Sequence, residues 1–297
     1  MFSPPDHDKL RIHVAIATVG RPQSIDRIVS LLPDQTRPAD GVVVVATCDD
    51  DVRGLISESP GETVLFAPKG LCRQRNAALD FLKGKSDVVV FIDDDFIPVP
   101  DFLEQIERLM RQDSSLVGLT GHLVADGAHT GEIHAADALA RLATQSRQAG
   151  AQTERTTWLY GCNMAIRLSA AENLRFDEKL PLYGWQEDVD FSARLGRRGS
   201  MLRSADLSGI HLGTRSGRVS GRRFGYAQVA NILYLRRKRT ISAVHGYGLL
   251  LRNLTMNLAR SLWPEADIDR RGRLIGNAMA FADVLRGSID PGRIEQI

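Results

Sequence analysis

Cysteine is scarce in this sequence. The 297 residues contain three, Cys48, Cys72 and Cys162, an odd number with no short spacing between them. Such a set excludes a disulfide framework, and it lacks the paired cysteines of a structural zinc site. We therefore expect a protein of a reducing compartment and interpret the chain as cytoplasmic.

Long apolar runs are also missing. The longest stretches without Asp, Glu, Lys or Arg, among them residues 224–235 and 240–251, have twelve residues, whereas a membrane span needs ~18–20. The first ten residues have neither a basic start nor an apolar core, so no secretion signal is expected there. These absences predict a soluble protein that at most lies on a membrane, at its inner face.

Acidic residues are almost absent from one segment. The formal net charge is +2, but residues 194–260 carry 14 Lys and Arg against the single acid Asp206, while residues 1–193 carry 19 against 29. Uncompensated positive charges repel one another unless they face solvent or an anionic partner. The partner is either an anionic membrane surface, a nucleotide diphosphate or the acidic part of the chain. Nucleic acid is not expected, because the segment has no recognisable binding module or aromatic platform.

Apolar runs of strand length alternate with helical patterns through the first part of the chain. Strands are expected at 11–19, 41–48, 62–67, 87–92 and 115–125, with a helix at 71–82. This alternation predicts right-handed crossovers and an α/β fold, with a mostly parallel sheet flanked by helices. A further strand is expected at 156–167 and helices at 132–150 and 188–198.

The remainder of the chain has helical periodicity and basic charge. Residues 217–286 are predicted to be mainly helical, with breaks at Gly246, Gly248 and Pro264. We expect one α/β domain over residues 1–215 and a helical C-terminal extension over 216–297 that packs on it.

Three consecutive carboxylates end the most strand-like run. In FIDDDF, at residues 91–96, Asp93, Asp94 and Asp95 follow an apolar strand, at the sheet edge where open α/β folds bind ligands. Like charges this close raise one another's pKa unless a cation neutralises them. Their oxygens suit Mg²⁺ or Mn²⁺ bridging to a substrate phosphate. The alternative is a solvated turn that leads into the next helix.

Other charged residues stand where a site would need them. Glu187 and Asp188 begin an expected helix, where the helix dipole favours carboxylates, and simple capping is the alternative. Arg73 and Arg75 open the helix at 71–82, a credible place for a phosphate group. His211 follows a short expected strand and is a candidate ligand for a metal ion or a pyrophosphate.

In order along the chain, these pieces resemble those of the family 2 glycosyltransferases with the GT-A (Rossmann-like) fold, of the inverting type found in bacterial polysaccharide synthesis. The resemblance covers residues 12–240, and FIDDDF fits the hydrophobic-DxD metal motif of that family. The matching motifs are TVGRP (18–22), GLCRQRNAAL (70–79), FIDDDF (91–96), GCNMAIR (161–167), FDEKLPLYGWQEDVDFSARLGRRG (176–199) and NILYLRRK (231–238).

The resemblance implies roles for the matching residues. Asp93 and Asp95 would contact the nucleotide sugar and its Mn²⁺ or Mg²⁺, with His211 as a further candidate ligand. One of Glu187 and Asp188, with Asp188 preferred, would be the catalytic base. The remaining nucleotide-sugar contacts would be Thr18, Arg21, Arg75 and Asp94.

Two positions are less defined by the resemblance. Members of the family commonly carry an acidic pair and Gly-Ser after the second strand, whereas this chain has ATCDDD. Asp49 is our candidate for the contact to the nucleotide base, and the choice among residues 49–51 stays open. The aromatic faces of Trp158, Tyr183 and Trp185 either stack on a sugar or pack internally, and we assign Trp185 to the acceptor.

The resulting prediction is a metal-dependent, inverting hexosyltransferase. It would move a sugar from a nucleotide-sugar donor, expected to be UDP-linked, to a hydroxyl of a saccharide or lipid-linked saccharide in polysaccharide biosynthesis. Two other classes stay open. A nucleotidyltransferase that forms sugar nucleotides would need a Gly-rich basic loop where TVGRPQS stands. A non-enzymatic binder of anionic polymers would use residues 194–260.

Overall fold

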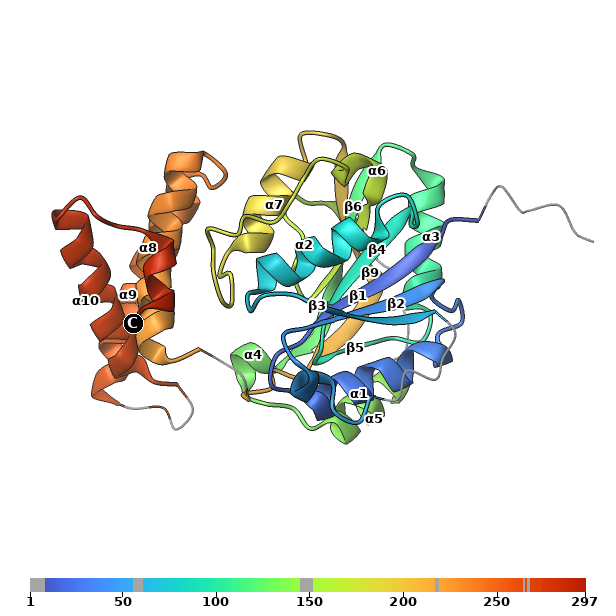
Figure 1. Cartoon of the computed structure of the whole chain (residues 1–297), viewed down its shortest axis with the longest axis horizontal. Coiled ribbons are helices and arrows are strands. Elements are labelled where there is room, and N and C mark those ends of the chain that lie inside the picture. The colour runs from blue at the N-terminus through green and yellow to red at the C-terminus, as the bar shows by residue number, and fades with distance from the viewer. Residues whose placement is uncertain (1–8, 56–60, 145–151, 217–218, 264, 266–267) are drawn as a thin grey trace, which may run out of the picture.

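A computed structural model describes residues 9–55, 61–144, 152–216, 219–263, 265 and 268–297. One α/β unit and a group of C-terminal helices make up the molecule (Figure 1). The strands are β1 (Ile12–Ala17), β2 (Gly41–Ala46), β3 (Glu62–Phe66), β4 (Val88–Asp93), β5 (Phe96–Pro98), β6 (Leu116–Asp126), β7 (Thr153–Arg155), β8 (Asn163–Arg167) and β9 (Ser200–His211). The helices are α1 (Pro22–Leu31), α2 (Leu71–Leu82), α3 (Phe102–Gln112), α4 (Gly127–Thr130), α5 (Ala135–Thr144), α6 (Leu168–Ala171), α7 (Glu187–Leu195), α8 (Gly221–Lys238), α9 (Ala243–Leu262) and α10 (Arg270–Leu285).

The strands form one nine-stranded sheet in the order β3-β2-β1-β4-β8-β6-β9-β5, with β7 paired to β9. Neighbouring strands from β3 to β4 are parallel, as are β6 and β9. The mostly parallel α/β sheet expected from the sequence is therefore confirmed. β8 runs antiparallel between β4 and β6, and only residues 163–167 of the strand expected at 156–167 are extended.

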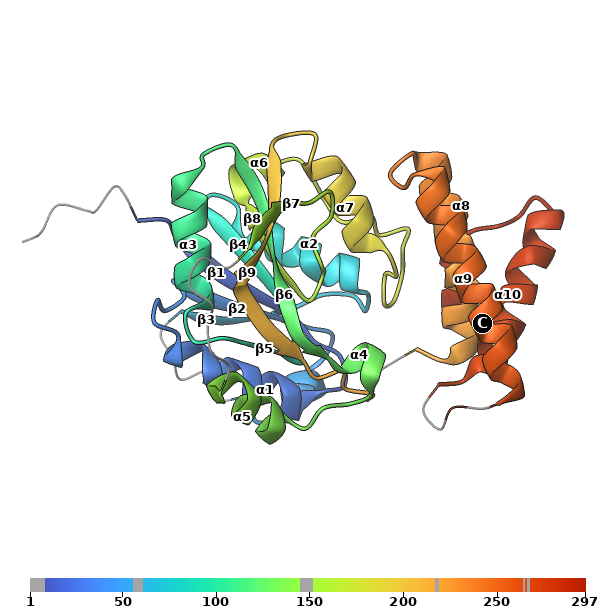
Figure 2. The ribbon, with the colours of Figure 1, turned by 180° about the vertical axis from the view of Figure 1, so that it is seen from behind.

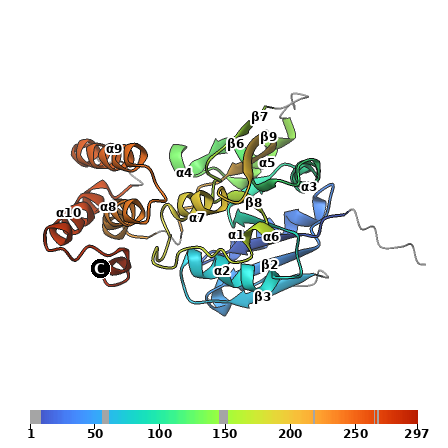
Figure 3. The same cartoon turned by 90° about the horizontal axis from the view of Figure 1, so that it is seen from above.

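Alternate residues of the central strands fill two separate cores. Val89 and Phe91 of β4 pack with α2 on one face of the sheet, while Val88 and Val90 pack with α1 and α3 on the other. Because both faces are covered, β1, β2 and β4 are apolar apart from His13 and the terminal Asp93, with no alternating pattern. The helices on both faces are seen in Figure 2 and Figure 3.

The C-terminal helices lie beside the α/β unit, with α8 nearest to it (Figure 1, Figure 3). α8 and α10 approach closely through glycines: a Cβ on Gly225 would lie 2.1 Å from the carbonyl oxygen of Arg273, and one on Gly276 would lie 2.0 Å from that of Arg222. A larger residue at either position would push the two helices apart.

The expected helix breaks at Gly246 and Gly248 are wrong. Both glycines lie inside α9, and a Cβ on Gly246 would lie 3.2 Å from the Arg236 side chain, so this glycine serves the approach of α9 to α8. The chain turns earlier, where Arg239 caps α8 in the left-handed conformation with φ of 61°. Pro264, the third expected break, lies outside the described residues.

Three kinds of contact hold α8 against the segment that leads into α7. The Phe224 ring lies 5.8 Å from that of Trp185, edge to face. Asn231 donates 2.8 Å to the Trp185 carbonyl oxygen. Lys238 forms ion pairs with Asp177 and, at 2.8 Å, with Asp190.

Within the described residues, no helix has the length and hydropathy required to cross a bilayer.

Candidate active site

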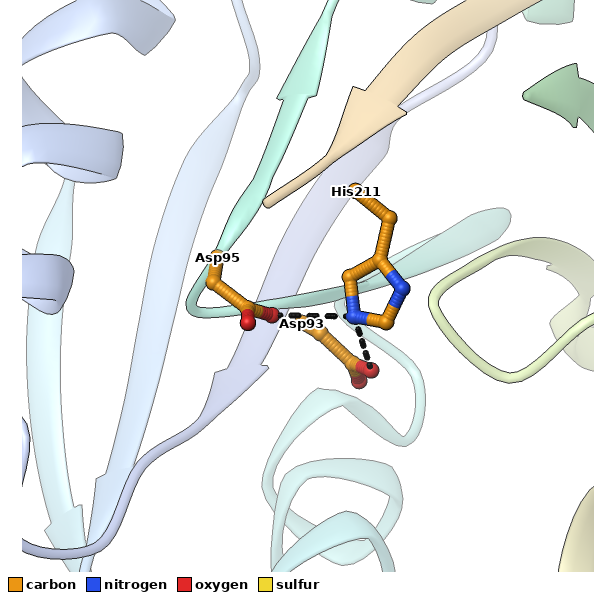
Figure 4. Close-up of side chains that lie close together, drawn as sticks. All are labelled: Asp93, Asp95 and His211. Atoms are coloured by element: carbon orange, nitrogen blue, oxygen red, sulfur yellow. Dashed lines mark ion pairs between the residues drawn. The ribbon is translucent and has the colours of Figure 1, made fainter. Parts of the chain in front are cut away.

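Three segments far apart in sequence meet at the carboxyl ends of the central strands. β4 ends at Asp93, the following turn carries Asp94 and Asp95, and β9 ends at His211. Asp93, Asp95 and His211 offer ligand atoms that all lie within 4.8 Å of one another, and their side chains converge on one point (Figure 4). The triplet is thus part of a binding edge, as expected, and is not a freely solvated turn.

Two carboxylates and one imidazole form a donor set that fits a divalent cation. The Nε2 atom of His211 lies 3.1 Å from Asp95 and 3.9 Å from Asp93. Carboxylate oxygens at this density suit hard divalent ions, and an imidazole nitrogen can complete the set. The cluster is consistent with a divalent metal such as Mn²⁺ or Mg²⁺.

His211 is held in place from behind by Asp126. These residues are register partners on the parallel strands β6 and β9, and the His211 Nδ1 atom lies 2.9 Å from an Asp126 oxygen. Fixing Nδ1 leaves Nε2 directed at Asp93 and Asp95, which is the usual arrangement behind a metal-binding histidine. Tyr160 donates 3.1 Å to the second Asp126 oxygen.

The charges of the cluster shift one another's pKa. For Asp95, burial raises the pKa, but the hydrogen bond and charge of His211 outweigh burial and bring the pKa to about 2. For His211, burial lowers the pKa, whereas hydrogen bonds to Asp126 and Asp95 raise it to about 10. The carboxylates around His211 thus favour positive charge at this point of the site.

Thr18 and Arg21 both contact Asp94, and all three were expected near the nucleotide. The Thr18 hydroxyl donates 2.7 Å and the Arg21 guanidinium 2.9 Å to Asp94, which is buried. Burial raises the pKa of Asp94 to about 6, against the opposing charge of Arg21. Arg21 also donates 3.0 Å to the Thr214 carbonyl oxygen and so ties the loop after β1 to the loop after β9.

Arg75 links the two acidic clusters of the site. From the second turn of α2 it reaches Asp93 at 3.2 Å and forms a buried ion pair with Glu187 at the start of α7. It also donates 2.8 Å to the Gly161 carbonyl oxygen. Its side chain is 3% exposed, so Arg75 cannot swing out into solvent without breaking all three contacts.

Glu187 and Asp188 have different environments although they are adjacent. Glu187 is buried, one of its oxygens is paired with Arg75, and the other, Oε2, has no hydrogen-bond partner among the described residues. Asp188 is half-buried, and its two oxygens accept from the backbone N–H groups of Gly161 at 3.1 Å and Val189 at 2.8 Å. Burial raises the pKa of Asp188, and the Gly161 N–H opposes this effect.

The two remaining candidates lie at the margin of the site. Asp49 is exposed at the start of a short 3-10 helix after β2, and it is Asp51 that contacts the loop after β1, by accepting 2.6 Å from the Gly20 N–H. Trp185 is half-buried and packs on Phe224, whereas Tyr183 is 56% exposed.

Sequence reasoning missed Asp126, Tyr160 and Gly161. Asp126 ends a strand as Asp93 does, so the rule applied to the triplet would have singled it out as well. Tyr160 contributes its hydroxyl group and Gly161 its backbone N–H and carbonyl oxygen. Both residues lie in a loop where the sequence predicts a strand. Their roles depend on the antiparallel insertion of β8, which local sequence patterns do not reveal.

The model of the glycosyl transferase family group 2 matches residues 88–265. The chain belongs to this family and is a glycosyltransferase. No curated protein matches it.

Several solved structures share the fold at low sequence identity. A mannosyltransferase from Pyrobaculum calidifontis, in complex with GDP-Man and Mn²⁺, is 15% identical with a TM-score of 0.55 over 97% of this chain and 79% of its own. S. aureus TarS 1–349 is 14% identical, with a TM-score of 0.53 over 97% and 83%. GalNAc-T7 with UDP, GalNAc and Mn²⁺ is 15% identical, with a TM-score of 0.53 over 69% of this chain, which spans only 44% of that structure.

Proposed function

We propose that the protein transfers a hexose from a nucleotide-sugar donor to an acceptor hydroxyl with inversion at the anomeric carbon, in a metal-dependent reaction. The observation that carries the proposal is the division of the acids into two clusters. Asp93, Asp95 and His211 form one, Glu187 and Asp188 form the other, and Arg75 contacts both. A single displacement needs a cation for the departing diphosphate and a carboxylate for the acceptor proton.

On the donor side, Asp93, Asp95 and His211 would hold Mn²⁺ or Mg²⁺. When bound, the ion supplies positive charge that stabilises the departing diphosphate. Mn²⁺ and nucleotide or nucleotide-sugar ligands in two of the fold neighbours support this assignment. Thr18, Arg21, Arg75 and Asp94 would line the nucleotide-sugar site, Asp49 would approach the base, and a UDP-linked donor is proposed.

On the acceptor side, Asp188 is the proposed catalytic base. Two backbone N–H groups orient its carboxylate, and it is more exposed than Glu187. A raised pKa makes a carboxylate a better proton acceptor near neutral pH. Glu187 is already committed to Arg75, so we assign it to holding that arginine between the two clusters.

The acceptor is proposed to be a saccharide or a lipid-linked saccharide of polysaccharide biosynthesis, presented at the inner face of an anionic membrane. Trp185 would border its site, supported by its position two residues before Glu187. We propose that residues 1–215 form the catalytic domain and that residues 216–297 form an extension that serves acceptor access.

Product analysis tests this function. The protein is incubated with Mn²⁺, a panel of nucleotide sugars and simple saccharide acceptors, and both the released nucleotide and the anomeric configuration of the product are measured. The proposal predicts release of a nucleoside diphosphate and an inverted anomeric centre. A retained configuration would exclude the single displacement, and formation of a sugar nucleotide with pyrophosphate would indicate a nucleotidyltransferase.

A further inference from the structure

Large apolar side chains are exposed mainly on the C-terminal helices. Of sixteen such side chains among the described residues, eleven lie between residues 244 and 285. Single exposed apolar residues are ordinary on a protein surface, but a contiguous group marks a surface for interaction with a partner or membrane.

On α9 these side chains form one row. The row consists of Val244, Tyr247, Leu251, Leu258 and Leu262, which are 52% to 88% exposed. Their spacing of three, four, seven and four residues places them on one side of a helix. The buried residues of α9 are different ones, Gly246, Leu250 and Asn257, so the row is not the face by which α9 packs on the rest of the protein.

The chain segment that carries the row is basic and has no acidic residue. Residues 221–263 contain eight Lys and Arg and no Asp or Glu, and Arg237, Arg239 and Arg252 are exposed. The run at 236–239 contributes less than its four charges suggest. Lys238 is paired with Asp177 and Asp190, and Arg236 donates 2.7 Å to the Ile241 carbonyl oxygen.

Two partners could cover the row: a second copy of the chain or a lipid surface. The positive charge of this segment favours the lipid surface. Two copies facing each other through α9 would bring their arginines together with no acid from residues 221–263 between them, and like charges across an interface are costly. An anionic leaflet accepts the apolar side chains below its headgroups and attracts the arginines at the same time.

We propose that α9 lies in the plane of an anionic membrane surface, with the row inserted and the exposed arginines at the level of the headgroups. The consequence for catalysis rests on the proposed function. α8 connects α9 to the segment around Trp185 and α7, so a docked α9 would hold the acceptor side of the site near a lipid-linked saccharide.

Vesicle co-sedimentation of the full chain tests the proposal. We expect wild type to pellet with phosphatidylglycerol-containing vesicles, to release with rising salt, and not to pellet with pure phosphatidylcholine. The double variant Leu251→Asp/Leu258→Asp should lose at least about tenfold in partitioning. The matched control is Leu139→Asp, an exposed leucine of α5 in the α/β unit, which should bind as wild type does. Thermal unfolding of each variant checks that it is folded.

The proposal would be overturned if wild type did not pellet with vesicles at low salt, or if the row variant pelleted as much as wild type. It would also be overturned if light scattering showed that wild type does not bind vesicles but forms a dimer that the row variant cannot form. Donor turnover with a soluble acceptor is measured in parallel. The row variant should keep it, because the row lies outside the catalytic residues. If wild type turns over the donor but does not bind vesicles, only the docking surface is refuted, whereas absence of turnover in wild type refutes the proposed function.

Discussion

Arg75 forms a buried ion pair with Glu187, a residue 112 positions further along the chain. The pair joins the second turn of α2 to the first residue of α7 and makes the adjacent acids Glu187 and Asp188 unequal. Glu187 compensates a buried charge, whereas Asp188 is held by backbone N–H groups and remains half-buried.

Removing one partner of this pair should be costly. Arg75→Met leaves Glu187 buried without its counter-charge, so we expect a loss of about 3–5 kcal/mol in the free energy of unfolding. Urea denaturation measures it. The double variant Arg75→Met/Glu187→Met, which removes both charges, should recover most of the loss but no activity. A single variant as stable as wild type would contradict the buried pair.

Exchanging the proposed base should affect turnover rather than donor binding. Asp188→Asn keeps the shape of the side chain but cannot take a proton, so kcat should fall by ~10²–10⁴-fold with donor affinity nearly unchanged. Steady-state kinetics and calorimetry with the donor measure the two quantities. Glu187→Gln is the control and should chiefly lower stability. If donor affinity collapsed in Asp188→Asn, this residue would belong to the donor side.

Asp126 should act on the metal site through His211. Asp126→Asn weakens the hold on the His211 Nδ1 atom, so the affinity for Mn²⁺ should fall by about 10–100-fold. Titration with Mn²⁺ followed by electron paramagnetic resonance measures it. Tyr160→Phe removes a hydrogen bond to the second Asp126 oxygen and should change the affinity little. Unchanged affinity in Asp126→Asn would mean that Asp126 does not orient the ligand.

The contact between α8 and α7 should depend on pH through Asp177. Burial alone would raise the pKa of Asp177, but Lys238 and Tyr234 outweigh burial and hold the pKa below its ordinary value of 3.8. A lowered carboxyl pKa stabilises the fold above the unfolded value and loses this effect as the pH falls below it. Asp177→Asn should therefore destabilise the protein at neutral pH, and the difference should shrink below pH 3.8. A difference independent of pH would exclude the ionised pair as its cause.

Sequence alone predicts those site residues that follow a recognisable local pattern, such as an apolar strand. Asp93 to Asp95 could be placed because a continuous apolar strand precedes them, and strand ends in a parallel sheet share one edge. Asp126 and Gly161 could not, because their contacts depend on how β8 inserts between β4 and β6.

The sequence also predicts only some features of the C-terminal helices. The helical nature of residues 217–286 follows from composition, but Gly246 was taken for a break because its reason lies in the Arg236 side chain of a neighbouring helix. Likewise, the sequence shows four basic residues in a row at 236–239, but only the fold shows that Lys238 pairs with Asp177 and Asp190.

The central claim is that catalysis requires a cation held by the carboxylates after β4. Its most direct test is nucleoside diphosphate release from the donor as a function of Mn²⁺ concentration, for wild type and Asp95→Ala, with folding of both checked by circular dichroism. We predict saturable Mn²⁺ dependence in wild type, loss of turnover on chelation, and no turnover in Asp95→Ala at any Mn²⁺ concentration. Full activity of Asp95→Ala in the presence of a chelator would contradict the claim.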